Sequence, residues 1–384
     1  MEMASFAAAP TKPGPRAGAV FAGAKGSGKM LLLGGYGEAG PAGDSWTYDG
    51  GTDAWAPLVL NAGSPSPFPR IDTSVCFVNS PAPHLSQVVY LFGGVSFDDE
   101  EALILNDLWR LDVTHDGPCQ WTYVAEECPP AERSNHVLCA IDDASGTMML
   151  HGGEQMGQVF GDTWLYCAAT NKWLAHSATG GGGQAPIARF GHASCSLGDG
   201  CAAIFGGIGA GEAGPEYLND LWIFQLAAGG VGGAWAPVDM LEGIAPSPRD
   251  KPAMCAGPDG RLFIFGGYGL CAVEDGDVAQ GSAMDEGGAD DDDELVAEGY
   301  LHDVWWLTMP QIGSTGVVQV AAHKEGCSSF VEVPTVDGWR GGRGATAVVR
   351  AAADGSTQAL VFGGFVETAH CSEFLADRAL VVPV

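Results

Sequence analysis

Short apolar runs separated by turn residues recur along the whole chain, and none of them shows the 3.6-residue period of an amphipathic helix. Their length, their β-branched and aromatic content and the glycines that bound them predict short β-strands. Six of the runs end in a diglycine. These are Gly34-Gly35, Gly93-Gly94, Gly152-Gly153, Gly206-Gly207, Gly266-Gly267 and Gly363-Gly364. Such self-similarity along a chain is the signature of a repeat architecture.

Two further markers accompany each diglycine in a constant order. An arginine stands upstream, at Arg16, Arg70, Arg133, Arg189, Arg249 and Arg343. An Asp-x-aromatic step stands downstream, at Asp44-Ser-Trp46, Asp107-Leu-Trp109, Asp162-Thr-Trp164, Asp220-Leu-Trp222 and Asp303-Val-Trp305, with Ser372-Glu-Phe374 in the sixth copy. A second aromatic residue then follows, at Trp55, Trp121, Trp173, Trp235 and Phe330. Each copy therefore predicts four short strands.

One such sheet cannot bury both of its faces, but sheets packed radially around an axis cover one another. The order of arginine, diglycine, Asp-x-Trp and tryptophan closely resembles the kelch repeat, and the resemblance extends over nearly the whole chain. It implies an all-β fold, a single six-bladed β-propeller of the kelch/galactose-oxidase type. The expected blades are residues 16–60, 70–126, 133–178, 189–240, 249–335 and 343–384.

The two ends of the chain predict how the ring closes. The sixth copy runs out after three strands, whereas residues 4–9 precede a proline-rich turn and carry an aromatic residue, Phe6. We expect residues 4–9 to form the missing fourth strand of the last blade. A disordered N-terminal tail is the alternative.

The net charge of the chain excludes some classes of binding partner. The chain has 17 basic and 47 acidic residues and a formal net charge of −30. Nucleic acids and anionic membranes require clustered Lys and Arg, so we expect neither as a partner.

The eleven cysteines are an odd number that suits no complete disulfide framework. We therefore expect reduced thiols and a cytoplasmic protein.

Residues 268–301 form an acidic insertion in the fifth copy, where 38 residues separate Gly267 from Trp305. It contains no Lys or Arg and includes Asp290, Asp291, Asp292 and Asp293. A block of like charges is usually solvated. Because this insertion lies between a second and a third strand, it would sit on a potential binding face of the propeller. The leading hypothesis is therefore a protein-interaction scaffold without a cofactor, whose aspartates contact a partner protein with a basic surface.

An enzyme is the alternative. Glu294, Glu298 and His302 are spaced as Glu-x3-Glu-x3-His, which resembles the Glu-x3-Asp-x3-His iron motif of the glucosinolate specifier proteins, themselves kelch propellers. Carboxylates with an imidazole can hold Fe(II) and leave coordination positions open. The middle residue departs from that motif, and His302 also stands where the third strand would begin. The resemblance would imply an iron-dependent lyase, and we favour the scaffold.

Overall fold

The computed structural model describes residues 11–23, 29–38, 40–79, 82, 84–98, 101–115, 117–125, 128–176, 184–211, 214–238, 245–257, 260–272, 296–301 and 303–308. It also describes the backbone of six later strands, β31 to β36. All secondary structure elements in these residues are β-strands. No helix in the described part of the chain is long and apolar enough to cross a bilayer.

Each complete copy folds into an antiparallel sheet whose strands lie in chain order. The first three sheets contain β1 (Val20–Ala22), β2 (Lys29–Leu33), β5 (Ser45–Asp49) and β6 (Ala54–Pro57); β8 (Ser74–Val78), β9 (Leu85–Asp98), β10 (Glu101–Thr114) and β11 (Gln120–Ala125); and β12 (Val137–Asp142), β13 (Thr147–His151), β16 (Thr163–Cys167) and β17 (Lys172–His176). The next two contain β19 (Ala193–Gly198), β20 (Cys201–Phe205), β23 (Leu221–Leu226) and β24 (Gly233–Val238); and β26 (Ala253–Ala256), β27 (Arg261–Phe265), β30 (Val304–Thr308) and β31 (Phe330–Val333).

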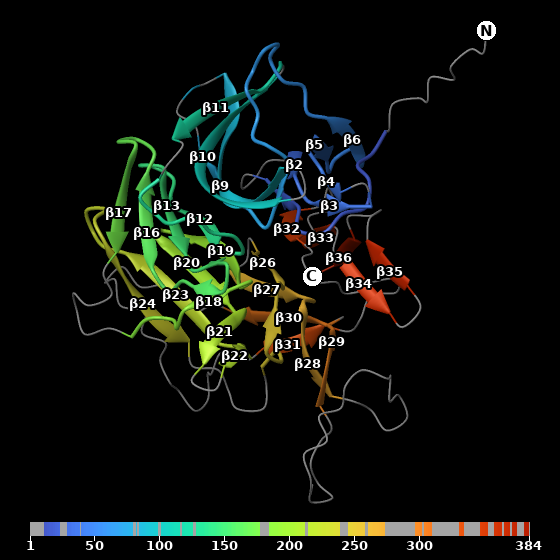
Figure 1. The fold of residues 1–384 in the computed structure, drawn as a ribbon, viewed down its shortest axis with the longest axis vertical. Coiled ribbons are helices and arrows are strands. Elements are labelled where there is room, and N and C mark those ends of the chain that lie inside the picture. The colour runs from blue at the N-terminus through green and yellow to red at the C-terminus, as the bar shows by residue number, and fades with distance from the viewer. Residues whose placement is uncertain are drawn as a thin grey trace, which may run out of the picture.

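The last sheet contains three described strands, β32 (Thr346–Ala351), β33 (Thr357–Phe362) and β36 (Leu380–Pro383). The first strands of successive sheets contact one another in turn, from β1 through β8, β12, β19 and β26 to β32, and β32 also contacts β1. Figure 1 shows the resulting ring, in which the red C-terminal strands lie beside the blue N-terminal ones. The fold is a β-propeller, as the repeat predicts.

The core lies between neighbouring sheets, as the strand β20 illustrates. Its residues Ala202 and Ile204 pack against Met149 of the preceding blade, whereas Ala203 and Phe205 pack toward the blade that follows. All four residues are fully buried. Both faces of the sheet are covered, which explains why second strands are continuous apolar runs instead of alternating ones. The predicted filling of tryptophans between blades includes Trp121 and Trp235.

The sixth copy corrects one assignment made from the sequence. Phe374 does not open its third strand, because this residue lies in β35 (Cys371–Phe374), which pairs only with the hairpin strand β34 (Phe365–Thr368) among the described strands. The third strand is β36, whose Leu380 pairs with Val361 as Trp46 pairs with Leu32 in the first sheet. The connection between the second and the third strand is longer in this copy, from Phe362 to Leu380, so the aromatic residue at the expected distance falls in the hairpin instead of the third strand. Residues 4–9, Arg343, Gly363 and Gly364 lie outside the described residues, so closure by an N-terminal strand stays a prediction.

Eight cysteines of the described part of the chain are free thiols. Four of them, Cys76, Cys139, Cys195 and Cys255, stand at equivalent positions of the first strands β8, β12, β19 and β26. Burial raises the pKa of each of these four thiols, to about 12 for Cys139. Buried, protonated thiols behave as small hydrophobic side chains.

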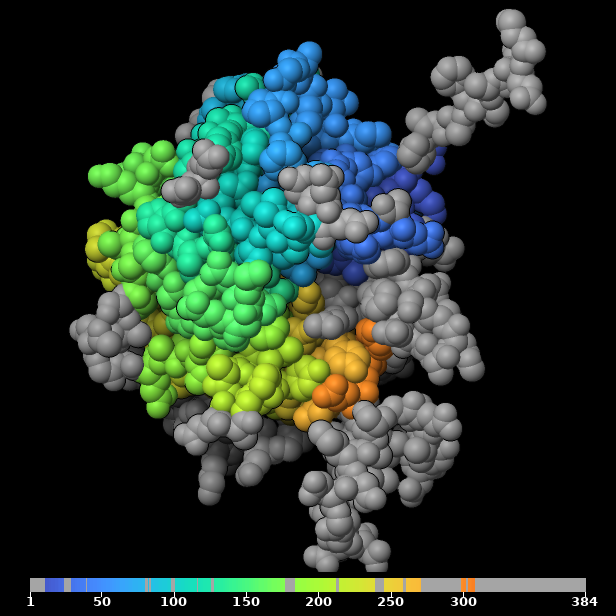
Figure 2. All heavy atoms as spheres, viewed as in Figure 1, coloured from blue at the N-terminus to red at the C-terminus, as the bar shows by residue number. Residues whose placement is uncertain are grey.

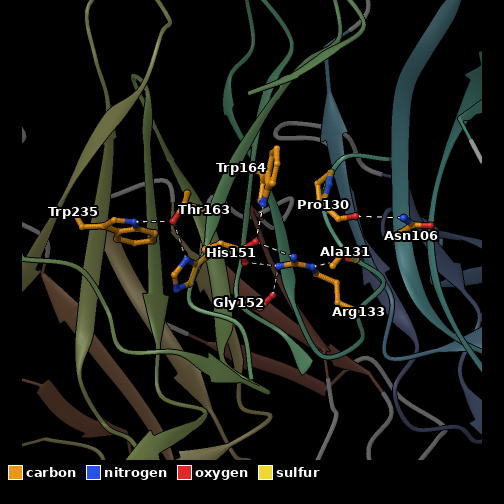
Figure 3. Close-up of polar contacts among 10 residues, drawn as sticks. Asn106, Pro130, Ala131, Arg133, His151, Gly152, Thr163, Trp164 and Trp235 are labelled. Carbon is orange, nitrogen blue, oxygen red and sulfur yellow. Dashed lines mark hydrogen bonds and ion pairs between the residues drawn. The ribbon is translucent and has the colours of Figure 1, made fainter. Parts of the chain in front are cut away.

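The repeat arginine of each described copy joins three strands of its own blade. In the third blade, Arg133 donates from Nη1 and Nη2 to the two carboxylate oxygens of Asp162, at 2.7 and 3.0 Å (Figure 3). Nη1 also donates to the carbonyl of Gly152 at 2.9 Å, and Trp164 Nε1 donates to Asp162 at 2.7 Å. The same bidentate pair recurs as Arg16–Asp44, Arg70–Asp107, Arg189–Asp220 and Arg249–Asp303. We call these contacts the repeat ion pairs.

The carboxylates of three of these pairs, those of Asp44, Asp162 and Asp220, stay ionised at neutral pH. Burial raises the pKa of Asp44, Asp162 and Asp220, but hydrogen bonds from the arginine and the tryptophan and the charge of the arginine outweigh burial. The net pKa of each is below its ordinary value. These three carboxylates thus remain charged over the whole physiological range.

The diglycine connects each blade to the next one. The N–H of Gly153 donates to the carbonyl of Arg189 at 2.8 Å, and Gly35, Gly94 and Gly207 donate in the same way to Arg70, Arg133 and Arg249. Gly152 has a φ of +65°, and a Cβ placed there would lie 2.5 Å from the carbonyl oxygen of Arg189. Glycine is therefore required at this position by both conformation and space.

We expect Arg189→Met to lower the free energy of unfolding by about 3 kcal/mol or more, because a buried partner of Asp220 is lost together with its hydrogen bond to Gly206. Arg110→Met is the matched control. It breaks the Arg110–Asp112 pair, whose side chains are 37% and 27% exposed, and should cost less than about 1 kcal/mol. Urea denaturation measures both variants, and equal losses would contradict the role assigned to the repeat ion pairs.

The variants Gly152→Ala and Gly157→Ala distinguish the two reasons for glycine in the diglycine, its positive φ and the lack of space for a Cβ. Both glycines have positive φ, but no atom lies within 4 Å of a Cβ at Gly157. Both variants should share a strain of about 1 kcal/mol, and Gly152→Ala should lose roughly 2 kcal/mol more through its clash with the next blade. Thermal unfolding that ranks the two variants equally would show that the contact between blades carries no stability.

Candidate functional site

One end of the propeller carries an additional layer of hairpins. Strands alternate in direction, so every connection from a second to a third strand emerges at the end where the diglycines and repeat arginines lie. The hairpins there are β3 (Tyr36–Gly37) with β4 (Gly40–Pro41), the outer parts of β9 and β10, β14 (Glu154–Gln155) with β15 (Gln158–Val159), β21 (Ile208–Gly211) with β22 (Gly214–Tyr217), and β28 (Tyr268–Ala272) with β29 (Val296–Tyr300). We call this end the hairpin face.

The repeat arginines also support these hairpins through their backbone. Arg70 pairs with Ser96, Arg189 with Gly209 and Arg249 with Gly269, which gives the short strands β7 (Arg70–Ile71), β18 (Arg189–Phe190) and β25 (Arg249–Asp250). The side chain of each arginine is meanwhile held inside its own blade. The hairpins therefore rise from rigid positions of the scaffold.

Aromatic side chains lie on the hairpin face in two groups. Tyr36 and Phe97 come from the first two blades, are 41% and 40% exposed, and meet edge to face with ring centroids 6.4 Å apart. The ring centroid of Tyr268 lies 6.4 Å from that of Tyr217 in the fourth blade and 5.0 Å from that of Tyr300 in its own hairpin. Figure 2 shows yellow-green, gold and orange segments, the colours of this part of the fourth and fifth copies, side by side on the surface. Such amphipathic aromatic residues are enriched at protein interfaces.

Each of the five hairpins named above also contributes a carboxylate to this face. Glu38, Glu101, Glu216 and Glu298 are exposed, and Glu154 is half-buried. The carboxylates of Asp44, Asp162 and Asp220 remain 40–46% exposed although each is paired with an arginine. The hairpin face therefore has a negative electrostatic field.

A narrow ring of backbone surrounds the axis at this end. It consists of the residues two positions after the repeat arginines, which all have φ between +47° and +66°: Gly18, Asp72, Asn135, Gly191 and Lys251. The N–H of Asn135 donates to the carbonyl of Asp72, Gly191 donates to Asn135, and Lys251 donates to Gly191, at 2.7–3.0 Å. We call these five residues the axial ring.

An ion pair spans the axial ring. Lys251 Nζ, from the fifth blade, donates to Asp72 Oδ1, from the second blade, at 2.6 Å. The two side chains are 21% and 17% exposed. No marker of the repeat signals this contact, because its residues are 179 positions apart and the other four copies have glycine, asparagine or alanine at the equivalent position.

Most of the site residues expected from the sequence lie outside the described residues. These are Asp290, Asp291, Asp292, Asp293, Glu294 and His302. Glu298 is described; it pairs with Leu270 in the β28–β29 hairpin, and its side chain is exposed. Within the ranges that the structure describes, no three metal-ligating side chains come together. The iron site therefore stays a prediction.

Three buried histidines lie below the hairpin face. His136 and His192 follow repeat arginines by three positions, and His151 precedes a diglycine and meets His192 with ring centroids 5.5 Å apart. Burial lowers the pKa of His136 and His151 to about 3, assisted by the charges of Arg133 and Arg189. Burial, together with the neighbouring His151, takes the pKa of His192 well below its ordinary value. All three rings are neutral at physiological pH.

These histidines predict an acid-sensitive fold. In the unfolded chain these histidines become protonated below about pH 6.5, whereas in the folded chain His136 and His151 become protonated only near pH 3. The free energy of unfolding should therefore decrease as the pH falls through this window. The loss should be about 2 kcal/mol per histidine at pH 5. His192→Thr should reduce the slope of unfolding free energy against pH. Threonine fits because Thr73 holds the equivalent place against Gly94 that His192 holds against Gly207.

His84→Gln is the control, because His84 is exposed and should leave the slope unchanged. Urea denaturation at several pH values between 4 and 7.5 measures the slopes. An unchanged slope in His192→Thr would contradict the assignment of His192 as a buried neutral group.

Comparisons with known proteins agree with the repeat and the sheets. The model of the KLHDC2/KLHL20/DRC7 Kelch-repeats domain matches residues 81–280. The chain is 28% identical to the dynein alpha chain of the flagellar outer arm from Chlamydomonas reinhardtii over 192 residues, which are 50% of this chain and 4% of that protein. It is 27% identical to an F-box/kelch-repeat protein from Arabidopsis thaliana over 210 residues, 53% of this chain and 40% of that protein. Each match thus spans less than half of the relative's length.

One solved structure extends the agreement in fold to the whole chain. The structure of YjhT superposes with a TM-score of 0.61 and covers 98% of this chain and 97% of that one, at 14% sequence identity. At this identity the likeness concerns the fold alone.

Proposed function

The chain belongs to the kelch-repeat domain family, and from this premise we propose that it is a protein-interaction scaffold that binds its partner on the hairpin face. The observation that carries the proposal is the chemistry of that face, where the exposed Tyr36 and Phe97 and three half-buried tyrosines stand among carboxylates on rigid hairpins. Segments similar to this chain also occur inside a dynein chain and an F-box/kelch-repeat protein, two proteins of different description. A module that recurs in such different proteins suits a role in binding.

We infer that the partner presents a basic surface. The chain carries a net charge of −30, and the hairpin face adds a carboxylate from each described hairpin. Complementary charge raises the association rate and discriminates against acidic partners. Asp290 to Asp293 belong to the connection between β28 and β29 in sequence, and we include them in the proposed surface. The free thiols of the described residues support a role in a reducing compartment such as the cytosol.

A pair of matched double variants tests this proposal. Glu38→Gln with Glu216→Gln removes two charges from the hairpin face, and Asp143→Asn with Asp199→Asn removes two exposed charges from turns at the opposite end. Quantitative affinity capture with wild type and both variants identifies proteins that the hairpin variant alone loses. The purified partner should then associate roughly threefold or more slowly with the hairpin variant at low salt. The difference should shrink as salt shortens the screening length below about 10 Å.

Equal binding by the two double variants would remove the partner from the hairpin face. Association rates that do not depend on salt would contradict the basic character of the partner. Both outcomes are within reach of the experiment, because the capture step itself supplies the partner whose association is then measured.

A further inference from the structure

The ion pair across the axial ring places a cation at the centre of an otherwise acidic face. Of the five described ring residues, only Lys251 is cationic, and it lies with Asp72 between hairpins that all carry carboxylates. We propose that Lys251 is an internal substitute for a cationic side chain of the partner, and that an arginine or lysine of the partner displaces it from Asp72 on binding. This inference rests on the function proposed above.

The backbone of the ring does not require a lysine at this position. Lys251 has a φ of +47°, in the left-handed region that favours glycine and asparagine. Gly191 and Asn135 occupy the equivalent positions, and each makes the same backbone hydrogen bond to the preceding blade. The contribution particular to Lys251 is therefore its side chain, which reaches across the ring to the second blade.

The ion pair between Lys251 and Asp72 has features that would let another cation replace Lys251. Lys251 donates one hydrogen bond from a point-like ammonium group, and both side chains reach solvent. The repeat ion pair Arg70–Asp107 is different, since it is bidentate and its side chains are 2% and 12% exposed. An incoming guanidinium can engage the carboxylate of Asp72 through two parallel hydrogen bonds. The carboxylates of the hairpin face would concentrate such cations at the axial ring.

Displacement predicts an effect opposite to that of ordinary contact residues. Removing the charge of Lys251 should strengthen the binding of a cationic ligand, because the competitor for Asp72 is gone. The expected gain is roughly two- to fivefold in Kd, the range of a partly exposed ion pair. Asp72→Asn should weaken binding, and Lys251→Gly should bring no gain when it is combined with Asp72→Asn.

The experiment uses a fluorescent hexa-arginine peptide as the probe, with Kd measured by anisotropy at low salt. The proteins are wild type, Lys251→Met, Lys251→Gly, Asp72→Asn and the Lys251→Gly/Asp72→Asn double variant. Lys251→Gly guards against misfolding, because glycine adopts the φ of this position without strain. Lys172→Met is the matched control; it removes the same charge from an exposed lysine beside the turn between β16 and β17, at the opposite end.

A second readout follows the displaced lysine directly. Reductive methylation with mass spectrometry should show that the peptide accelerates labelling of Lys251 in the wild type, because its amine is released, while labelling of Lys172 stays constant.

Tighter binding by both Lys251 variants but not by Lys172→Met supports the proposal. Equal tightening by Lys172→Met, or an unchanged Kd for both Lys251 variants, overturns it and leaves the scaffold function intact. Absence of peptide binding by Lys251→Gly also overturns it, because Asp72 then has no competing cation. The capture experiment with the hairpin and control variants decides the scaffold function separately.

Discussion

The buried arginine of each copy is the constraint on which the described part of the propeller depends. A guanidinium group cannot be buried without matching charge and acceptors, and each described copy supplies both, through an aspartate at the start of the third strand and a glycine carbonyl at the end of the second. The side chain thus fixes three strands of one blade. The backbone carbonyl of the same residue accepts the N–H of the preceding diglycine, as Arg189 does from Gly153. One residue therefore sets the geometry within a blade and between blades, and it does so at the end of the molecule where the hairpins emerge.

This arrangement separates the parts of the chain that must be constant from those that can vary. The repeat arginine, the diglycine and the Asp-x-Trp step are held by contacts that leave little room for substitution, as the 2.5 Å approach of a Cβ at Gly152 to Arg189 shows. The hairpins lie beyond these contacts and differ in length, from the two-residue strands β14 and β15 to the five-residue strands β28 and β29. The hairpins can therefore change their side chains without disturbing the scaffold, which supports the proposal that they bind the partner.

The sequence predicted the fold wherever the markers of the repeat keep their regular order and spacing. Regular markers identified the second and third strands of five copies, because each marker residue has a specific physical task in the repeat ion pair. In the sixth copy an aromatic residue at a plausible distance was assigned to the wrong strand, since spacing alone does not distinguish Phe374 in a hairpin from Leu380 in the sheet. The axial ion pair could not be predicted at all. Asp72 and Lys251 are brought together by the closure of the ring, and neither residue belongs to the repeated pattern.

The use of arginine in the scaffold also adds to the acidity of the surface. Five of the 17 basic and five of the 47 acidic residues form the described repeat ion pairs. The rest of the chain therefore has 12 basic and 42 acidic residues. The pairs do not change the net charge, but they remove more positive than negative charge from the surface. Each arginine is buried, whereas three of the five aspartates remain 40–46% exposed. A cation on the hairpin face is thus exceptional among the described residues. That Lys251 nevertheless occupies the axial ring, in a backbone conformation suited to glycine, is best explained by its charge at the centre of a surface that attracts cations.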